Sequence, residues 1–368
     1  MKRFLVVLIT LLLLFRGVYV QGLSVSARAA VVIDGISGKL LYSVNANERL
    51  SMASTTKIMT ALLLCESGDL KRQVTITEEM IRVEGTSMGL TVGMKVTLYD
   101  LLYGMLLSSG NDAANATAVS LGGSMDGFVA MMNRKAASIG LKNTHFDTPS
   151  GLDGPTHYTT AYELAVLTKE ALKNEDFSKA AQTRSITLNY GGVSHTLTNH
   201  NRLLSTYDGA VGVKTGFTKK SGRCLVSAAK RDNGLIIAVT LNDGNDWQDH
   251  SNMLDYGFSL LSQSSNEFKG KTYNVAVHGG VADTVSASSQ TVSFRTAQGE
   301  NVEEKVCILP FVSAPVSAGE MVGYIEYYCS DELVAKQTLR ADSEIAALPQ
   351  ADFWDLLFMT FKNLLKYI

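Results

Sequence analysis

The sequence predicts an α+β protein, in which strands at both ends of a helical middle form one antiparallel sheet. The first observation is a hairpin pattern over residues 29–45, where two short apolar runs flank the turn residues 34–38. The second is a later hairpin, whose apolar runs at 223–230 and 235–241 flank an Asn-Gly dipeptide. Because a lone hairpin is barely stable in water, we expect both hairpins to join one sheet that packs against the helices.

Between the hairpins, apolar residues recur at spacings of three and four, which is typical of amphipathic helices. Helices are expected over residues 55–65, 98–107, 112–121, 125–139 and 160–172. Together with the two hairpins, they define a first domain at residues 24–265.

After this domain, the pattern changes to short alternating apolar runs separated by Gly, Ser and Ala, which indicates strands. The runs lie at residues 275–277, 292–294, 322–326 and 333–339. They predict a small all-β domain at residues 266–346. It carries no chemical motif, so we expect a spacer or docking role.

The first 22 residues have the pattern of a secretion signal. Lys2 and Arg3 precede an apolar run over residues 4–15, and a mixed stretch follows. Crossing a bilayer needs about 20 apolar residues, so this run is too short for a permanent anchor. We therefore expect an exported protein, with residues 1–22 removed as a signal peptide.

Residues 350–368 have the pattern of an amphipathic helix, with apolar side chains on one face and charges on the other. The charges of Asp355, Lys362 and Lys366 argue against burial across a membrane, while Trp354 suits an interface. We expect this helix to lie on the outer face of the cytoplasmic membrane and to hold the protein there peripherally. A helix packed on its own protein is the alternative.

Charge argues against one class of partner. The chain has 368 residues, of which 33 are basic and 35 acidic, with no sustained basic block. This balance gives no sign of a nucleic-acid partner.

Cysteine and histidine patterns give little sign of disulfides or metals. Cys65, Cys224, Cys307 and Cys329 are scattered, so free thiols are expected, with a Cys307–Cys329 disulfide as the alternative. The six histidines include no pair at metal-binding helical spacing, so we expect no metal and no cofactor. By the same pattern, the histidines at 157 and 250 are interpreted as surface or core-edge residues.

The chemistry begins with two Ser-x-x-Lys segments, a form found where lysine activates a serine nucleophile. Ser54 and Lys57 lie at the start of an expected helix, where a spacing of three brings both side chains to one face. Ser227 and Lys230 lie in an expected strand, where residues three apart point to opposite faces. Only the first copy is therefore expected to be reactive, although a serine at a helix start is also a common N-cap.

Two further motifs follow. Ser109-Gly110-Asn111 lies in an expected loop between two helices, but the Ser-x-Asn form also occurs elsewhere in the chain and is typical of turns. Lys214-Thr215-Gly216 occurs once, after a short strand pattern. An ammonium and a hydroxyl together bind a carboxylate, and glycine permits a close backbone approach. The alternative is an ordinary strand end with a glycine kink.

In this order and local structure, these motifs resemble the serine D-alanyl-D-alanine carboxypeptidases, the low-molecular-mass penicillin-binding proteins. The resemblance covers residues 24–260 and extends beyond the motifs to 53–60, 106–114 and 255–258. Gly110 is the family's residue in the second motif, where β-lactamases commonly have Asp. The resemblance implies a β-lactamase-like transpeptidase domain, followed by a small β domain and an amphipathic anchor.

The resemblance also implies the reaction. A carboxypeptidase of this family removes the terminal D-alanine from peptidoglycan stem pentapeptides and is acylated by β-lactam antibiotics. Ser54 would attack the carbonyl between the two D-alanines, with neutral Lys57 taking its proton. Asn111 would hold Lys57, and Ser109 would relay the proton to the leaving amine.

Substrate binding is implied in the same way. Lys214 and Thr215 would hold the substrate carboxylate, and the backbone N–H groups of Ser54 and Phe217 would form an oxyanion hole. This family often has a further basic residue after the last strand of the sheet. None stands there in this sequence, so Arg202 is the candidate for that charge.

Two other functions remain open at this stage. A β-lactamase would share acylation at Ser54 but needs a carboxylate that drives water onto the acyl-enzyme. Glu163 lies in an ordinary amphipathic helix pattern and is not expected to do this. A cell-wall-binding or drug-sensing protein would be acylated without useful peptide turnover.

Overall fold

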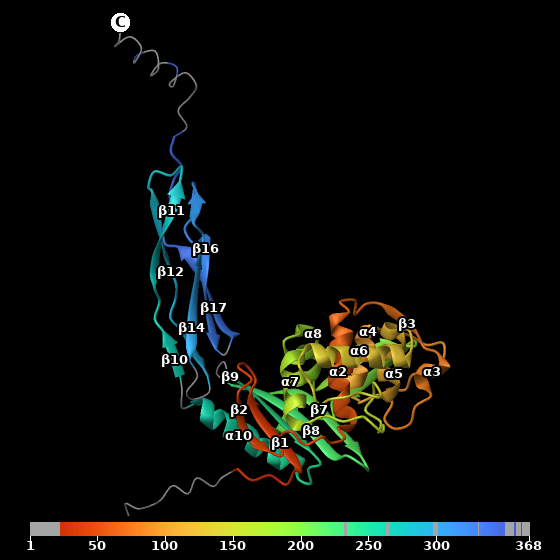
Figure 1. Cartoon of the computed structure of the whole chain (residues 1–368). Helices are drawn as coiled ribbons and strands as arrows, with labels where there is room; N and C mark the ends of the chain where they lie inside the picture. Colours follow the sequence, from red (N-terminus) through yellow and green to blue (C-terminus); the bar gives the residue numbers. More distant parts are fainter. Residues whose placement is uncertain are drawn as a thin grey trace, which may run out of the picture.

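A computed structural model describes residues 23–231, 234–262, 265–296, 301–329 and 331–349, together with Leu357 and Lys362. The described chain forms two bodies, a sheet with helices and an elongated C-terminal β domain that projects from one side of it (Figure 1). The expected fold class is confirmed for these parts.

The centre of the first body is a five-stranded antiparallel sheet in the order β2-β1-β9-β8-β7. Its strands are β1 (Ala29–Asp34), β2 (Leu40–Val44), β7 (Ala210–Thr218), β8 (Gly222–Arg231) and β9 (Gly234–Leu241). β1 pairs with β9, so the two predicted hairpins meet in one sheet as expected. Their pairing leaves β7 at the edge of the sheet.

The predicted helices are all present and lie on one side of this sheet (Figure 1). They are α2 (Lys57–Glu66), α4 (Leu98–Leu106), α5 (Asn111–Gly122), α6 (Met125–Ser138) and α7 (Ala161–Leu172). The sequence did not lead us to expect α8 (Glu175–Gln182), the short α3 (Glu78–Ile81) and α9 (Leu203–Thr206), or the pairs β3 (Gln73–Thr75) with β4 (Lys95–Thr97) and β5 (Ser185–Tyr190) with β6 (Val193–Thr198). The large apolar core lies between the helices and the sheet.

The opposite face of the sheet is covered by α10 (Asp246–Ser262), which contacts β8, β9 and β1. Met253, Leu254 and Leu261 of this helix pack on the outward side chains of β1 and β9. Both faces of the sheet are therefore buried, which explains why its central strands are apolar throughout.

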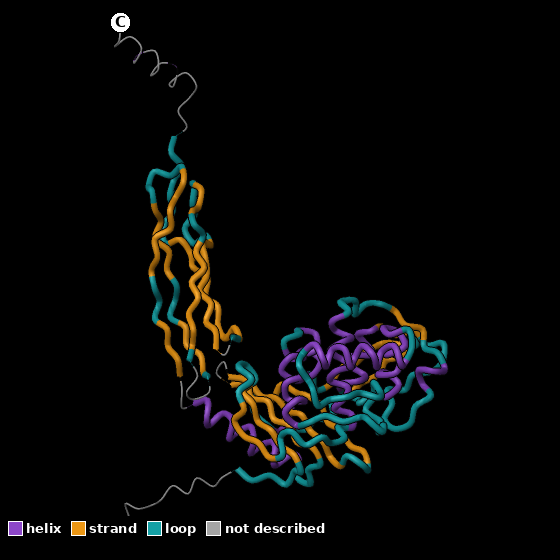
Figure 2. The backbone as a smooth tube through the Cα atoms, in the orientation of Figure 1, coloured by secondary structure: helices purple, strands orange, loops and turns teal. Residues whose placement is uncertain are grey.

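The C-terminal β domain is confirmed as all-β, and the strands run along its long axis (Figure 2). Six strands pair in the order β14-β16-β17-β12-β11-β15, and β10 pairs with β13. Their bounds are β10 (Ser265–Phe268), β11 (Thr272–His278), β12 (Thr284–Ser288), β13 (Val292–Arg295), β14 (Val302–Ile308), β15 (Phe311–Ser313), β16 (Met321–Cys329) and β17 (Glu332–Ala341).

Ion pairs join the two bodies. Glu332, at the start of β17, lies 3.1 Å from Nζ of Lys169 on α7 and 3.4 Å from Nζ of Lys173, the residue that follows α7. The β domain therefore contacts the helical layer directly through this carboxylate.

The predicted signal segment 1–22 lies outside the described residues. Of the predicted amphipathic segment, only Leu357 and Lys362 are described, and both are helical and exposed. Within the part of the chain that the structure describes, no helix is long and apolar enough to span a membrane.

The expected thiols are confirmed for all four cysteines, and the alternative disulfide between Cys307 and Cys329 is not formed. Cys307 faces Tyr324 and Cys329 faces Val302 across the β14–β16 ladder.

One expectation about side chains is wrong. His157 and His250 are not surface or core-edge residues, because both are buried. Each is accommodated there by hydrogen bonds to both ring nitrogens.

Candidate active site

The serine of the first motif lies in a tight turn that leads into α2. Ser54 belongs to a 3-10 turn (η1, Ala53–Thr56), and Lys57 is the first residue of the α-helix. Ser54 is partly exposed, whereas Ala53 and Thr55 on either side are fully buried. Its side chain caps no helix, so the alternative of a simple N-cap is not what the structure shows.

The Lys57 side chain is buried beneath this serine and makes three polar contacts. Its Nζ lies 2.8 Å from Ser54 Oγ, 2.7 Å from Asn111 Oδ1 and 2.7 Å from the carbonyl oxygen of Ser150. The two carbonyl oxygens accept hydrogens only, so they take both N–H groups of a neutral amine. The nitrogen lone pair then faces the Ser54 hydroxyl, as a general base requires.

Burial determines the charge state of this amine. Loss of hydration lowers the pKa of Lys57 well below its usual value, and the like charge of Lys214 lowers it further, while Asp112 acts in the opposite direction. The environment therefore favours the neutral form that can accept a proton.

The second motif supplies the partner that orients Lys57. Asn111 opens α5, and its Nδ2 donates to the Glu84 carbonyl oxygen at 2.7 Å, which leaves Oδ1 to face Lys57. Ser109 has a φ of 58°, a left-handed conformation that turns this loop residue into the site. Its carbonyl oxygen accepts from Thr86 Oγ1 at 2.6 Å, so the loop before α5 is fixed from both sides.

The third motif lies on the exposed edge strand β7. Lys214 is 1% exposed, and its Nζ donates to Ser109 Oγ at 3.0 Å and to the Thr215 carbonyl oxygen at 2.8 Å. Burial lowers the pKa of Lys214 to about 7. This ammonium therefore lies behind the strand and does not project into open solvent.

Gly216 allows β7 to lie against the turn that contains Ser54. A side-chain carbon at this position would come within 3.0 Å of the Ser54 backbone nitrogen. The backbone N–H of Ser54 and the edge of β7 are thus close neighbours, and the next residue, Phe217, is 66% exposed. From the sequence, Gly216 was expected to let the substrate backbone approach the strand; the neighbour observed here is the protein's own Ser54 turn.

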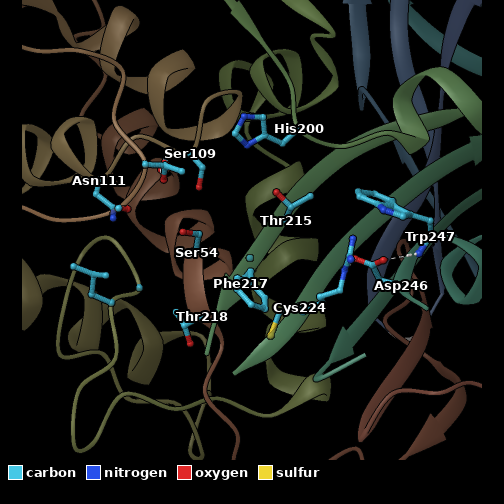
Figure 3. A pocket seen from close by; sticks show the side chains of 16 residues that line it. Ser54, Ser109, Asn111, His200, Thr215, Phe217, Thr218, Cys224, Asp246 and Trp247 are labelled. Atoms are coloured by element: carbon cyan, nitrogen blue, oxygen red, sulfur yellow. Dashed lines mark hydrogen bonds and ion pairs between the residues drawn. The ribbon is translucent and has the colours of Figure 1, made fainter. Parts of the chain in front are cut away.

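These residues surround one cavity of about 580 Å³ (Figure 3). The predicted residues that line it are Ser54, Ser109, Asn111, Thr215, Gly216 and Phe217. Lys57 and Lys214 lie behind its wall and reach it through their contacts to Ser54 and Ser109. The structure thus brings the three sequence motifs together.

Arg202, unlike most of the motif residues, does not line this cavity. It is exposed, and its guanidinium carbon lies 5.7 Å from the centre of the Trp247 ring. Trp247 itself lines the cavity (Figure 3), so Arg202 is close to the site only through its contact with this ring.

Sequence reasoning missed the basic residue that lines the cavity. Arg223 of β8 lies directly opposite Phe217 of β7. Its Nε donates to Asp246 Oδ2 at 3.1 Å, and its side chain is 51% exposed. Because Asp246 is nearly buried, it fixes the guanidinium at the cavity wall. Only the pairing register of β7 with β8 could have pointed to this residue.

His200 is a second lining residue that the sequence did not single out (Figure 3). Two causes lower the pKa of His200: partial burial, which has the larger effect, and the positive charge of Lys214. It lies in the segment between β6 and α9, for which the sequence carries no motif.

Residues expected to be inert lie away from the cavity. Ser227 is buried and bonded to His250 Nδ1 at 2.6 Å, while Lys230 is exposed. Glu163 accepts hydrogen bonds from the Asn143 backbone nitrogen at 2.8 Å and from Thr144 Oγ1 at 2.6 Å. Neither Ser227 nor Glu163 lines the cavity.

A serine beside a buried lysine, at the mouth of a cavity bounded by an edge strand, defines the class of serine enzymes that transfer acyl groups with a lysine base. Sequence profiles agree with this class. The profile of D-alanyl-D-alanine carboxypeptidases matches residues 17–245, and that of the penicillin-binding protein 5 C-terminal domain matches residues 267–347. The chain belongs to the D-alanyl-D-alanine carboxypeptidase family.

Individual relatives extend the likeness over nearly the whole chain. The D-alanyl-D-alanine carboxypeptidase DacF of Bacillus subtilis is 33% identical over 355 residues, which span 93% of this chain and 90% of DacF. DacC of Escherichia coli is 29% identical over 93% of this chain and 90% of its own.

Solved structures match as well. The carboxypeptidase DacD of Francisella tularensis superposes with a TM-score of 0.62 at 25% identity, covering 88% of this chain and 95% of DacD. The Streptomyces K15 DD-transpeptidase gives a TM-score of 0.62 at 34% identity, covering 64% of this chain and 98% of that enzyme.

Proposed function

We propose that Ser54 and Lys57 carry out the D-alanyl-D-alanine carboxypeptidase reaction of this family on the stem peptides of peptidoglycan. One observation carries the proposal: Lys57 Nζ is held by Asn111 Oδ1 and the Ser150 carbonyl oxygen, with its remaining position facing Ser54 Oγ. This arrangement orients a neutral amine toward the hydroxyl that it must deprotonate.

The reaction consists of acylation of Ser54 followed by hydrolysis of the resulting ester. The Ser54 hydroxyl proton passes to Lys57 Nζ while Oγ bonds to the carbonyl carbon between the two D-alanines. The C–N bond then breaks, and the proton returns through Ser109 to the leaving amine, which departs as D-alanine. Water next attacks the ester, releases the shortened peptide as a carboxylic acid and restores the hydroxyl.

The oxyanion that forms in both steps is stabilised by the backbone N–H groups of Ser54 and Phe217. The close approach of β7 to the Ser54 nitrogen at Gly216 supports this assignment. Removing one such donor costs about 3 kcal/mol of transition-state stabilisation in other enzymes.

Carboxylate binding involves Thr215 and Gly216 at the cavity wall, with Lys214 acting from behind them. Because the Lys214 ammonium is buried and already bonded to Ser109 and Thr215, its field rather than direct exposure attracts the carboxylate. We assign the direct contact to Arg223, a cationic lining residue whose Nη groups have no protein partner among the described residues. Arg202 adds charge at longer range, beside Trp247.

The location of the enzyme is part of the same proposal. Residues 1–22 serve as a signal peptide, residues 24–265 form the penicillin-binding domain and residues 266–346 form the β domain. Residues 350–368 attach the protein peripherally to the outer face of the cytoplasmic membrane. Removal of residues 350–368 is expected to release the protein from the membrane fraction, which cell fractionation followed by immunoblotting measures.

Acylation by benzylpenicillin tests the catalytic assignment. Intact-mass spectrometry is expected to show one penicilloyl adduct on the wild type, and peptide mapping to locate it at Ser54. Ser54→Ala should show no adduct and no D-alanine release from a peptide ending in D-Ala-D-Ala. The matched control is Ser227→Ala, which changes the serine of the second Ser-x-x-Lys segment and should acylate normally. An adduct at Ser227 would overturn the proposal.

The rival functions give different results in the same assay. The Glu163 carboxylate is occupied by Asn143 and Thr144, so we expect the penicilloyl adduct to persist rather than turn over rapidly. Rapid penicillin hydrolysis would identify a β-lactamase. An adduct without D-alanine release would identify a sensor.

A further inference from the structure

The peptide unit that joins Ala53 to Ser54 carries the proposed oxyanion N–H. A peptide is planar, and its C=O and N–H point in opposite directions, so fixing the carbonyl also fixes the N–H. The Ala53 carbonyl oxygen accepts a hydrogen bond from Thr56 Oγ1 at 2.8 Å. On the opposite side, the Ser54 nitrogen lies next to Gly216 of β7.

The Thr56 hydroxyl is itself oriented by a buried histidine. A hydroxyl has one hydrogen, and Thr56 gives it to the Ala53 carbonyl. Its oxygen can then only accept from His157 Nε2, which lies 2.7 Å away. His157 must therefore carry its hydrogen on Nε2.

The other ring nitrogen of His157 imposes the same tautomer. The backbone N–H of Asp147 donates to His157 Nδ1 at 2.9 Å, and a backbone N–H cannot accept. Nδ1 is therefore unprotonated. The Asp147 carboxylate is held in turn by the Thr156 backbone nitrogen at 2.9 Å and Thr156 Oγ1 at 2.6 Å.

Burial keeps this ring neutral. His157 is 3% exposed, and desolvation lowers its pKa to about 4, although Asp147 and Asp153 act in the opposite direction. At neutral pH the chain from Asp147 through His157 and Thr56 to the Ala53 carbonyl has one consistent direction of hydrogen bonding. The space is also tight, since a side-chain carbon on Gly151 would come within 2.0 Å of the Ala53 oxygen.

We infer that His157 is a positioning residue, which orients the Ser54 backbone N–H toward the oxyanion through Thr56 and the Ala53 carbonyl. His157 itself does not line the cavity. The inference rests on the proposed function, because it assigns a role within the oxyanion hole of Ser54.

Two substitutions at position 157 separate this role from simple packing. His157→Asn keeps an acceptor near Nδ1 but cannot reach Thr56, whereas His157→Gln keeps a donor near Nε2. Thr56→Val removes the hydroxyl at nearly constant volume. We expect Thr56→Val and His157→Asn to acylate about 10- to 100-fold more slowly, since small displacements of catalytic groups cost up to about 100-fold. His157→Gln should restore most of the rate.

The measurements are made per active molecule. The amplitude of the benzylpenicillin burst counts folded sites, and its rate constant at saturation reports acylation. Affinity for a D-boronoalanine peptide, whose boron forms a tetrahedral adduct with the serine oxygen, should weaken in parallel with the rate. A purely structural role would lower the amplitude and leave both constants unchanged.

His250→Asn is the matched control, because His250 is equally buried but bonds to Ser227 and Thr240, away from the cavity. It should lower the melting temperature without changing the acylation constant. Wild-type constants in Thr56→Val and His157→Asn would overturn the inference while leaving Ser54 catalysis intact. Failure of the wild type to acylate at Ser54 would overturn the proposed function itself.

Discussion

The two Ser-x-x-Lys segments share one spacing but have opposite surroundings. At the start of α2, Ser54 and Lys57 face each other, with 2.8 Å between Oγ and Nζ. In β8, Ser227 is buried toward α10 and Lys230 lies exposed near the strand end. A spacing of three suits a period of 3.6 residues but not a period of two.

The partners of each serine differ as much as the backbone. Ser54 meets an amine whose pKa is lowered by burial, at a cavity open to substrate. Ser227 is fully buried, does not line this cavity and meets His250, whose pKa is lowered by burial to about 3. Reactivity therefore requires a base, an oxyanion site and access together, and the motif alone provides none of these.

The largest effect is expected from removing the proposed base. Lys57→Ala should slow acylation by benzylpenicillin about 10²- to 10⁴-fold, the usual contribution of a positioned general base. Lys230→Ala changes the corresponding lysine of the inert segment and should stay within about twofold of the wild type. Stopped-flow acylation kinetics compare the two, and equal losses in both variants would break the distinction between the segments.

The next largest effect concerns Arg223, which stands on the same strand as Ser227 but reaches the cavity. Arg223→Gln should raise KM about 10- to 100-fold for a peptide with a free terminal carboxylate, since a charge-assisted hydrogen bond contributes about 1.5–3 kcal/mol. The same peptide with an amidated end should be unaffected. Arg202→Gln is the control, and an effect there equal to that of Arg223→Gln would move the carboxylate contact to Arg202.

A smaller effect is expected on the pH profile. The pKa of Lys57 is lowered below the usual value of 10.5. As the pH rises through this lowered pKa, the neutral fraction of Lys57 increases, and the acylation rate should increase with it. Lys214→Gln removes a like charge and should shift the midpoint to higher pH, most clearly below the Lys214 pKa of about 7.

Ser109→Ala supplies the comparison, because it loses the hydroxyl bonded to Lys214 without losing a charge. Its profile should fall in height and keep its midpoint. An unshifted midpoint in Lys214→Gln would show that burial alone sets the pKa of Lys57. Rates at saturating benzylpenicillin, measured across pH, provide the comparison.

Sequence patterns predicted the elements whose period is strong. The expected helix at 98–107 is observed as Leu98–Leu106, and the expected helix at 125–139 as Met125–Ser138. By contrast, β5 and β6 were missed, although Ile186, Leu188 and Tyr190 alternate with polar residues and pack on the core, as expected of a strand with one buried face. α10 was missed because it begins with polar residues that resemble a loop.

The motif residues were predicted because they occur in the order known from the family. The residues that contact and orient them were not predicted. His157 lies 101 positions from Thr56, and no local pattern connects a histidine to so distant a hydroxyl. Arg223 reaches the cavity only because the ladder places it opposite Phe217. Such residues depend on register and long-range packing, which one sequence does not encode in any short window.

The smallest effect on activity is expected from a substitution of Ser227, which should change the free energy of unfolding instead. Ser227→Ala leaves His250 Nδ1 without its 2.6 Å partner inside a fully buried site, so unfolding should become about 1–3 kcal/mol easier. Thermal unfolding with and without the substitution measures this cost, and the acylation rate should not change. Ser54→Ala should show the opposite pattern, with acylation lost and stability little changed. The Ser54 side chain is partly exposed, and its hydroxyl contacts the Lys57 amine that is proposed to deprotonate it. If Ser54→Ala were the more destabilising of the two, the Ser54 hydroxyl would also contribute to the stability of the fold. The distinction between a reactive serine and a structural serine would then fail.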